Sequence, residues 1–288
     1  MSLREKLQNG KFVVTAEIGP AKGVDIHEFN ENADLLKSRV DAVNCTDQQS
    51  AVMRLGSLAA CYLLKQKGIE PVLQMTCRDR NRIALQSDLL SAYVIGIENV
   101  LCLTGDYVTF GDHPDAKPVF DLDSVSLLYA ARQLEQGKDL AGKELKGAPK
   151  FFLGASVEPC ADPVEPQLIK MERKVNAGAQ FFQTQAVYEP KAFESFMKEA
   201  KKFGVPVLVG IVVLRSVTMA RFMNKNVAGI YIPEELINEL DKAENKLQKG
   251  TEIAARLIND MKGMCQGVHI MAIGLESKIP AILDAARL

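Results

Sequence analysis

Residues 206–213 read PVLVGIVV and contain no polar side chain. Residues 100–103, which read VLCL, show the same pattern. A strand with one face in water alternates apolar and polar residues, whereas a strand that is apolar on both faces is typical of a parallel sheet covered by helices. Strands that fill the interior of a barrel also have this pattern. The two runs therefore favour an α/β fold with a buried parallel sheet.

Short apolar runs alternate with helical patterns along the rest of the chain. The first run, Lys11–Ile18, precedes an expected helix at Asp25–Ser38, in which Phe29, Ala33 and Leu36 share one face. The further strands are expected at Ala42–Thr46, Pro71–Thr76, Asn99–Thr104, Phe151–Val157, Gln180–Gln185, Pro206–Val212 and Val268–Ile273. The helices expected after them are Ala51–Lys67, Asp79–Val94, Ser124–Gln136, Glu165–Ala177, Pro190–Phe203, Thr218–Asn224 and Ser277–Arg287.

Eight strand–helix units in 288 residues predict a (β/α)8 TIM barrel that forms a single domain over residues 1–288. An additional helical region is expected at Pro233–Lys262, before the last strand. An open, doubly wound sheet is the alternative fold. No Gly-x-Gly-x-x-Gly or Gly-x4-Gly-Lys-Ser/Thr phosphate loop follows any expected strand, so the usual nucleotide site of that alternative is missing.

The composition excludes several classes of function. A net charge of −1 provides no broad positive field for nucleic acid. No apolar run reaches the ~20 residues that span a bilayer, and no secretory segment follows Met1, so we expect a cytoplasmic protein without a membrane span. The three histidines share no ligand spacing with the six cysteines, so no metal site is expected and the cysteines are expected to be reduced thiols.

Polar residues end six of the expected strands, where a barrel places its catalytic groups. Glu17 follows Ala16 and precedes Ile18, and apolar surroundings would favour the neutral, proton-donating form of its carboxyl group. The alternative is a strand-end carboxylate that only caps the next loop. The segment 106–123 is longer than usual for such a loop and is expected to cover a ligand. The other strand-end groups are Thr46-Asp47, Thr76–Asp79, Thr104–Asp106, Glu158 and Gln183–Gln185.

Five motifs taken together resemble the methylenetetrahydrofolate reductase family: TAEIGP at 15–20, LTGD at 103–106, KVNAGA at 174–179, TQ at 184–185 and GVH at 267–269. The resemblance implies a flavin-containing (β/α)8 barrel that reduces 5,10-methylenetetrahydrofolate to 5-methyltetrahydrofolate. It also implies that Glu17 is the general acid that protonates N10 as the ring opens, and that reduced flavin then donates hydride. The sequence leaves the choice between FAD and FMN open.

The resemblance assigns further residues by position. Asp106 matches a carboxylate that meets the pterin and influences the flavin, and Gln185 matches the amide that orients folate. Without the resemblance, Lys174 lies in a charged helical segment that is typical of a solvated face. The flavin-contacting residues that the resemblance implies are Thr46, Thr76, Thr104, Gly105, Asp106, Phe120 and Lys174.

Two departures from the family pattern concern the cofactor and the electron donor. Gln167 stands in place of a flavin-side aspartate, so the phosphate or adenosine end of the cofactor is expected to be held differently. The family's aromatic residue after strand seven has no counterpart around Val217, which leaves the electron donor open. Phe120 or Tyr188 is the alternative stacking face for a nicotinamide. The donor is therefore NADH or a partner subunit with iron–sulfur clusters, as in the anaerobic one-carbon branch that these features resemble. A pterin-binding methyltransferase without flavin and a non-catalytic docking subunit of a redox complex remain alternative functions, and the oligomeric state is open.

Overall fold

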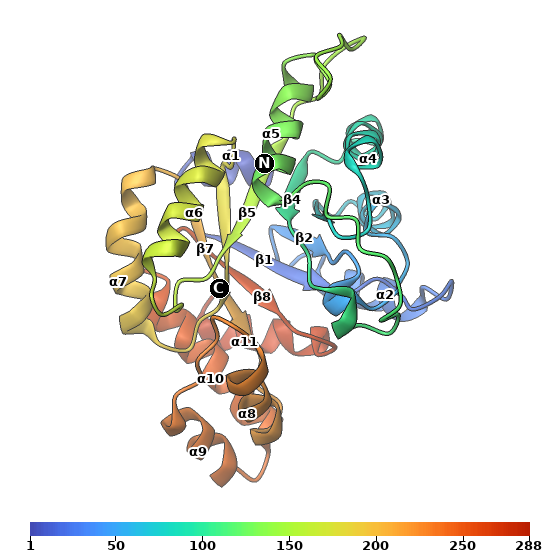
Figure 1. Ribbon diagram of the computed structural model, residues 1–288. Coiled ribbons are helices and arrows are strands. Elements are labelled where there is room, and N and C mark those ends of the chain that lie inside the picture. The colour runs from blue at the N-terminus through green and yellow to red at the C-terminus, as the bar shows by residue number, and fades with distance from the viewer.

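Eight parallel strands form a closed barrel in the order β1 to β8, with β8 paired to β1, in a computed structural model that describes all residues 1–288 (Figure 1). The expected (β/α)8 fold is therefore confirmed. The strands are β1 (Val13–Ile18), β2 (Ala42–Cys45), β3 (Pro71–Thr76), β4 (Asn99–Leu103), β5 (Phe152–Val157), β6 (Phe181–Ala186), β7 (Val207–Val212) and β8 (Gly267–Met271).

Helices surround the barrel and bury its outer surface (Figure 1). None of them is both long and apolar enough to cross a membrane. The helices that follow the strands are α2 (His27–Leu36), α3 (Ser57–Gln66), α4 (Arg82–Val94), α5 (Ser124–Glu135), α6 (Glu165–Asn176), α7 (Pro190–Ala200), α8 (Val217–Asn226) and α11 (Ile279–Ala286).

The expected additional helical region consists of two helices, α9 (Glu234–Lys242) and α10 (Lys246–Met261). Asn245 begins α10, because its side chain accepts a hydrogen bond from the backbone N–H of Gln248. The expectation of a helical region before β8 is thus confirmed, although the region is interrupted at residues 243–245. Helix α9 packs against both α8 and α10, at the lower end of the view in Figure 1.

A short helix that was not among the sequence expectations, α1 (Leu3–Gln8), covers the N-terminal end of the barrel. Ser2 and Glu5 form a capping box, which is the sequence signal for this helix. Leu3 and Leu7 are buried against a small core made by residues of the barrel strands: Val13, Ala42, Val72, Leu101, Phe152, Phe181 and Leu208. The barrel is therefore packed shut at this end.

Two stacked aromatic rings fill the barrel near α1. The ring centroids of Phe152 and Phe181 lie 4.8 Å apart at an interplanar angle of 23°. A Cβ atom on Gly154 would lie 2.3 Å from Cζ of Phe181, so only glycine leaves room for that ring. Apolar side chains therefore close the barrel interior at this end.

Candidate active site

A cavity of about 680 Å³, called the mouth cavity below, opens at the C-terminal ends of the strands. Seven of the residues that the sequence assigned to the site line it, and Thr46 and Phe120 do not. The seven are Glu17, Thr76, Thr104, Gly105, Asp106, Lys174 and Gln185. The fold thus brings together side chains from β1, β3, β6 and α6 and from the segment after β4.

Glu17 is buried near the end of β1, where polar groups surround its carboxylate. Nε2 of Gln49 donates to Oε1 at 3.0 Å, and Nε2 of Gln74 donates to Oε2 at 2.8 Å. Nε2 of His269 lies 3.7 Å from the same Oε2. The expectation of apolar surroundings is therefore wrong for the carboxylate, because its chain neighbours face the core and its contacts come from other strands and loops. A side-chain amide offers both donors and an acceptor, so these glutamines can bind either protonation state of Glu17.

Beneath Glu17, a buried polar network fills the middle of the barrel. Nδ1 of His269 lies 2.9 Å from Oγ1 of Thr15, and Nε2 of Gln183 donates to the same oxygen at 3.1 Å. Gln183 and Asn44 then exchange two amide hydrogen bonds, of 2.8 and 3.1 Å. These bonds satisfy the buried polar groups and fix the position of His269 against Glu17.

Lys174 on α6 is buried rather than solvated, and its Nζ donates to the carbonyl oxygen of Ser156 at 2.7 Å. Burial and the nearby positive charge of Lys170 lower the pKa of Lys174 to about 8. The charged pattern of the helix thus predicts a solvated Lys174 and is wrong, whereas the motif resemblance assigns this residue to the site whose wall it forms. Its ammonium group lies in the wall of the mouth cavity together with Lys170 and Arg173.

The floor of the mouth cavity at β2 and β3 is held by Asp47. Its Oδ2 accepts hydrogen bonds from the backbone N–H of Thr76 at 2.8 Å and from Oγ1 of Thr76 at 3.1 Å. Arg80 forms an ion pair with the same carboxylate and a second one with Asp88 at 2.9 Å. Asp47 thus fixes the backbone where β3 ends.

Gly105 gives the turn after β4 its shape. Its φ of +97° is in the region that favours glycine, and a Cβ atom there would lie 3.0 Å from Cβ of Thr76 and 3.1 Å from Cβ of Arg78. Arg78 itself is buried and its Nη1 donates to the carbonyl oxygen of Asp106 at 3.4 Å. The Asp106 side chain is exposed in the mouth cavity, so it is free to contact a ligand.

The segment 106–123 folds back over the loops that follow β1 and β2. Its short helix η2 (Val108–Phe110) packs on η1 (Gln49–Ala51), and Asp112 pairs with Lys22 and accepts from the backbone N–H of Met53. The hydrogen bond from Lys22 holds the pKa of Asp112 below its usual range. The segment is therefore ordered against the mouth, in a position suited to covering a ligand.

Gln185 lies at an irregularity of β6, where the register with β7 shifts between Gln183 and Ala186. Thr184 Oγ1 accepts from the backbone N–H of Gly210 at 2.8 Å, and a Cβ atom on Gly210 would lie 2.2 Å from the Thr184 carbonyl oxygen. Strand irregularities of this kind redirect side chains. Here both Gln183 and Gln185 reach the mouth cavity.

Three other residues from the sequence expectations do not line the mouth cavity. Thr46 is buried after β2, and its Oγ1 has no hydrogen-bond partner. Phe120 is half-buried, with its ring edge-on to Tyr107 at 5.7 Å. Tyr188 is buried and donates its hydroxyl proton to the carbonyl oxygen of Val212 at 2.9 Å. No Phe, Tyr or Trp side chain lines the mouth cavity.

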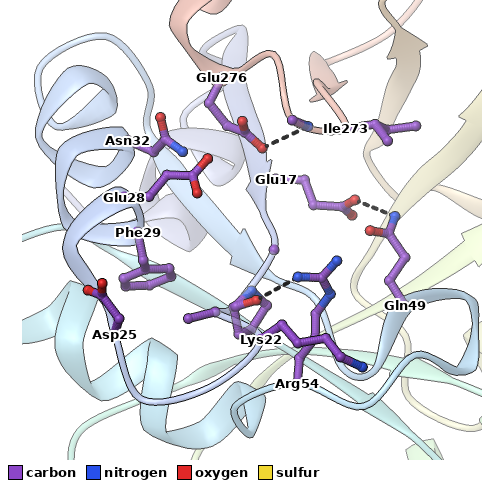
Figure 2. Close-up of a pocket in the computed structure, with 14 residues that line it drawn as sticks. Glu17, Lys22, Asp25, Glu28, Phe29, Asn32, Gln49, Arg54, Ile273 and Glu276 are labelled. Atoms are coloured by element: carbon purple, nitrogen blue, oxygen red, sulfur yellow. Dashed lines mark hydrogen bonds between the residues drawn. The ribbon is translucent and has the colours of Figure 1, made fainter. Parts of the chain in front are cut away.

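A second cavity of about 570 Å³, called the side cavity below, also borders Glu17 (Figure 2). It is formed by the segments after β1, β2 and β8 and by α2. Glu17 and Gln49 line both cavities. The other charged residues of the side cavity are Lys22, Asp25, Glu28, Arg54 and Glu276, and Figure 2 shows them among the lining residues.

Sequence reasoning missed Gln49 and Gln74, the two residues that bind the Glu17 carboxylate. A signal for Gln74 was present in β3. Val72, Gln74 and Thr76 are two residues apart, so they share one face of the strand, and the polar side chains of Gln74 and Thr76 indicate that this face meets a polar region. Gln49 had no such signal. It lies in a loop where Gln48 and Ser50 adopt positive φ angles, which only the folded contacts define.

The donor set of the mouth cavity suits a flavin nucleotide. Lys170, Arg173 and Lys174 make one wall cationic, which fits a cofactor phosphate. Thr104 and Gln167 offer a hydroxyl and an amide for the carbonyl and imide groups of the ring system. No group of three or more His, Cys, Asp or Glu side chains is arranged to hold a metal ion.

Comparison with known proteins identifies the family. The family model described as Methylenetetrahydrofolate reductase matches residues 2–287. A probable methylenetetrahydrofolate reductase (NADPH) of Caenorhabditis elegans is 24% identical over 243 residues, which cover 80% of this chain and 34% of that protein. Methylenetetrahydrofolate reductase 2 of Schizosaccharomyces pombe is 26% identical over 232 residues, which cover 75% of this chain and 35% of that protein. The chain thus spans about a third of the length of these relatives.

Solved structures share the fold at lower sequence identity. A protein of Clostridium thermocellum that binds two copies of 5-methyl-5,6,7,8-tetrahydrofolic acid superposes with a TM-score of 0.71 at 19% identity, covering 99% of this chain and 97% of that one. An oxaloacetate acetylhydrolase superposes with a TM-score of 0.58 at 11% identity, and the match covers 97% of this chain and 82% of that one. The family match extends over nearly the whole barrel and includes every strand that forms the mouth cavity. The chain belongs to the methylenetetrahydrofolate reductase family.

Proposed function

We propose that this chain reduces 5,10-methylenetetrahydrofolate to 5-methyltetrahydrofolate in the mouth cavity, with a bound flavin, either FAD or FMN. The observation that carries the proposal is the position of Glu17. A buried carboxyl group, bound by two amides and next to a buried histidine, borders a cavity large enough for ligands at the catalytic end of a barrel. The family match and the methyltetrahydrofolate-binding structural relative support a folate substrate.

Glu17 is proposed as the general acid. Protonation of N10 by the Glu17 carboxyl group lets the five-membered ring of the substrate open, and the remaining bond from N5 to the methylene carbon becomes an iminium ion. The reduced flavin, when bound, supplies the hydride that converts this carbon to a methyl group. Gln49 and Gln74 hold the Glu17 oxygens in place before and after the proton leaves, because an amide can donate to the carboxylate and accept from the acid.

The remaining assigned residues bind and orient. Lys174, with Lys170 and Arg173, is proposed to hold the cofactor phosphate, and Thr76, Thr104 and Gly105 to contact the cofactor where β3 and β4 end. Asp106 and Gln185 are proposed to hydrogen-bond the pterin and the amide of folate, because both side chains reach the mouth cavity. Flavin contacts by Thr46 and Phe120 rest on the motif resemblance alone.

A direct test uses the purified chain under anaerobic conditions. We expect a bound flavin, identified by mass spectrometry after extraction, that is reoxidised when the reduced protein meets 5,10-methylenetetrahydrofolate. The product should be 5-methyltetrahydrofolate in a one-to-one ratio to reoxidised flavin. A chain that binds neither FAD nor FMN would exclude this reaction and favour a flavin-free methyltransferase. A flavoprotein that folate does not reoxidise would favour a docking role in a redox complex.

A further inference from the structure

The proposed reaction consumes the Glu17 proton in every turnover, so the carboxyl group must regain one before the next. The buried network beneath Glu17 leads from His269 to Thr15, Gln183 and Asn44. His269 is the only titratable group of this network, and the hydroxyl group and two amides behind it are buried and bring it no proton from outside. On the other side, cofactor and folate would fill the mouth cavity. Neither direction offers Glu17 a ready source of protons.

The side cavity offers the third direction. Glu17 borders it but is only 8% exposed, and Gln49 and Gln74 bind both of its carboxylate oxygens, so the water of the cavity has little direct access to this group. The cavity itself is partly open to solvent. Among its other carboxylates, Asp25 and Glu28 are exposed, whereas Glu276 is only 7% exposed. Glu276 begins the short helix η4 (Glu276–Lys278) and accepts a hydrogen bond from the backbone N–H of Gly274 at 3.3 Å. It is therefore the buried carboxyl group that shares this cavity with Glu17.

The charges around Glu276 favour its protonated form. Burial is the main cause that raises its pKa, and the carboxylates of Glu28 on α2 and of Glu17 on β1 add to it. Of the cations that line the cavity, Lys22 pairs with Asp112, and Arg54, whose Nη1 donates to the carbonyl oxygen of Pro20, forms no ion pair with Glu276.

We propose that Glu276 is a proton-relay residue, which takes protons from the water of the side cavity and returns them to Glu17 between turnovers. This inference rests on the function proposed above. In the transfer, the O–H bond of the Glu276 carboxyl group breaks and the proton passes to the Glu17 carboxylate, directly or through a water molecule in the cavity. The Glu276 carboxylate then takes a proton from solvent, so that both groups return to their starting state. Glu276 acts through Glu17 and contacts no reacting atom.

The Glu276→Gln variant tests the relay. Its amide oxygen can still accept the hydrogen bond from Gly274, so we expect the fold and the flavin content to be retained. In a single turnover, pre-reduced variant mixed with 5,10-methylenetetrahydrofolate should react within about twofold of the wild-type rate, because one turnover does not require Glu17 to be recharged with a proton. With reduced methyl viologen as continuous electron donor, steady-state turnover should fall at least about tenfold, since each cycle then waits for a proton.

Three controls separate the relay from a structural role. Glu276→Asp keeps a carboxyl group and should recover turnover. Adding formate should recover it in Glu276→Ala, because a small acid fits the vacated space. Asp25→Asn, which changes an exposed carboxylate of the same cavity, should stay near wild type.

Two outcomes would overturn the relay: wild-type turnover in Glu276→Gln across the pH range, or an equal loss in single and multiple turnovers. The proposed function fails separately. In that case the wild-type chain itself does not reduce 5,10-methylenetetrahydrofolate, whatever the Glu276 variants do.

Discussion

Glu17 borders two cavities, and its replacement should separate chemistry from binding. Glu17→Gln keeps the size of the side chain and its place between Gln49 and Gln74, but an amide cannot donate the proton that opens the ring. We expect the variant to keep its flavin and to lose about 10²–10⁴-fold in the rate at which methylenetetrahydrofolate reoxidises the reduced protein. Stopped-flow absorbance measures this rate. A variant as fast as wild type would remove Glu17 from the role of acid.

Lys174 should make flavin binding depend on pH. Because burial lowers its pKa to about 8, the free protein carries the Lys174 charge below that pH and loses it above. If the ammonium group attracts the cofactor phosphate, flavin affinity should fall about tenfold between about pH 7 and about pH 9. Arginine stays charged over this range, so the flavin affinity of Lys174→Arg should change little between these two pH values. Fluorescence titration of the apoprotein measures both, and equal pH dependence in the two proteins would contradict the assignment.

Gln185 should affect folate binding and leave flavin binding unchanged. Its side chain reaches the mouth cavity from the irregular part of β6, where an amide can hydrogen-bond the pterin or the amide of folate. Loss of about 1 kcal/mol of hydrogen bonding in Gln185→Ala corresponds to a roughly fivefold weaker Kd for folate. Titration of the flavin absorbance with folate gives this constant. The same folate Kd in variant and wild type would refute the role.

At the scale of elements, the close packing of segment 106–123 on η1 depends on one glycine. A Cβ atom on Gly111 would lie 1.8 Å from the carbonyl oxygen of Ala51, so Gly111→Ala must push the segment away at a cost of about 1–3 kcal/mol. We expect faster proteolysis within 106–123 and weaker flavin retention. Gly263→Ala is the matched control, because no atom lies within 4 Å of a Cβ there. Equal proteolysis of both variants would show that the segment does not depend on this contact.

Local patterns were enough to predict the barrel elements but not everything that joins them. Every expected strand and its following helix is present, because hydrophobic periodicity reports burial directly. Helix α1 was missed although Ser2 and Glu5 carry its capping signal, since a six-residue helix has too few turns to show a period. The break between α9 and α10 depends on the cap at Asn245, which a run of helix-forming residues obscures.

The candidate site was predictable at strand ends and less so between them. Glu17 and Gln185 lie near the C-terminal ends of β1 and β6, Gly105 follows β4, and the parallel barrel brings such positions together. Gln49 comes from a loop with positive φ angles, and Glu276 reaches the side cavity from the far end of the chain. Their position depends on long-range packing, which no local pattern encodes.

At the scale of the whole molecule, the lining of the mouth cavity bears on the choice of electron donor. Hydride transfer from a nicotinamide requires close stacking, which an aromatic face normally supports, and no Phe, Tyr or Trp lines the mouth cavity. Tyr188, one alternative stacking face, is buried with its hydroxyl bound to Val212. With the proposed flavin bound, we therefore expect NADH to reduce it in the isolated chain more slowly than a partner protein with one-electron centres does. Rapid mixing with NADH measures this, and flavin bleaching as fast as steady-state turnover would show that no partner is needed.

Helix α1 and the stacked Phe152 and Phe181 rings make the barrel a cup with a closed base. Under the proposed function, nicotinamide and folate therefore both reach the cofactor through the mouth cavity. A nicotinamide would have to leave before folate enters. A large excess of folate would therefore compete with the nicotinamide, slow the reduction of the cofactor and lower the turnover rate. A donor that passes single electrons from the rim needs no place inside and would feel no such obstruction. The turnover rate at saturating folate thus distinguishes the two kinds of donor: excess folate should inhibit turnover with a nicotinamide and should not inhibit turnover with a one-electron donor.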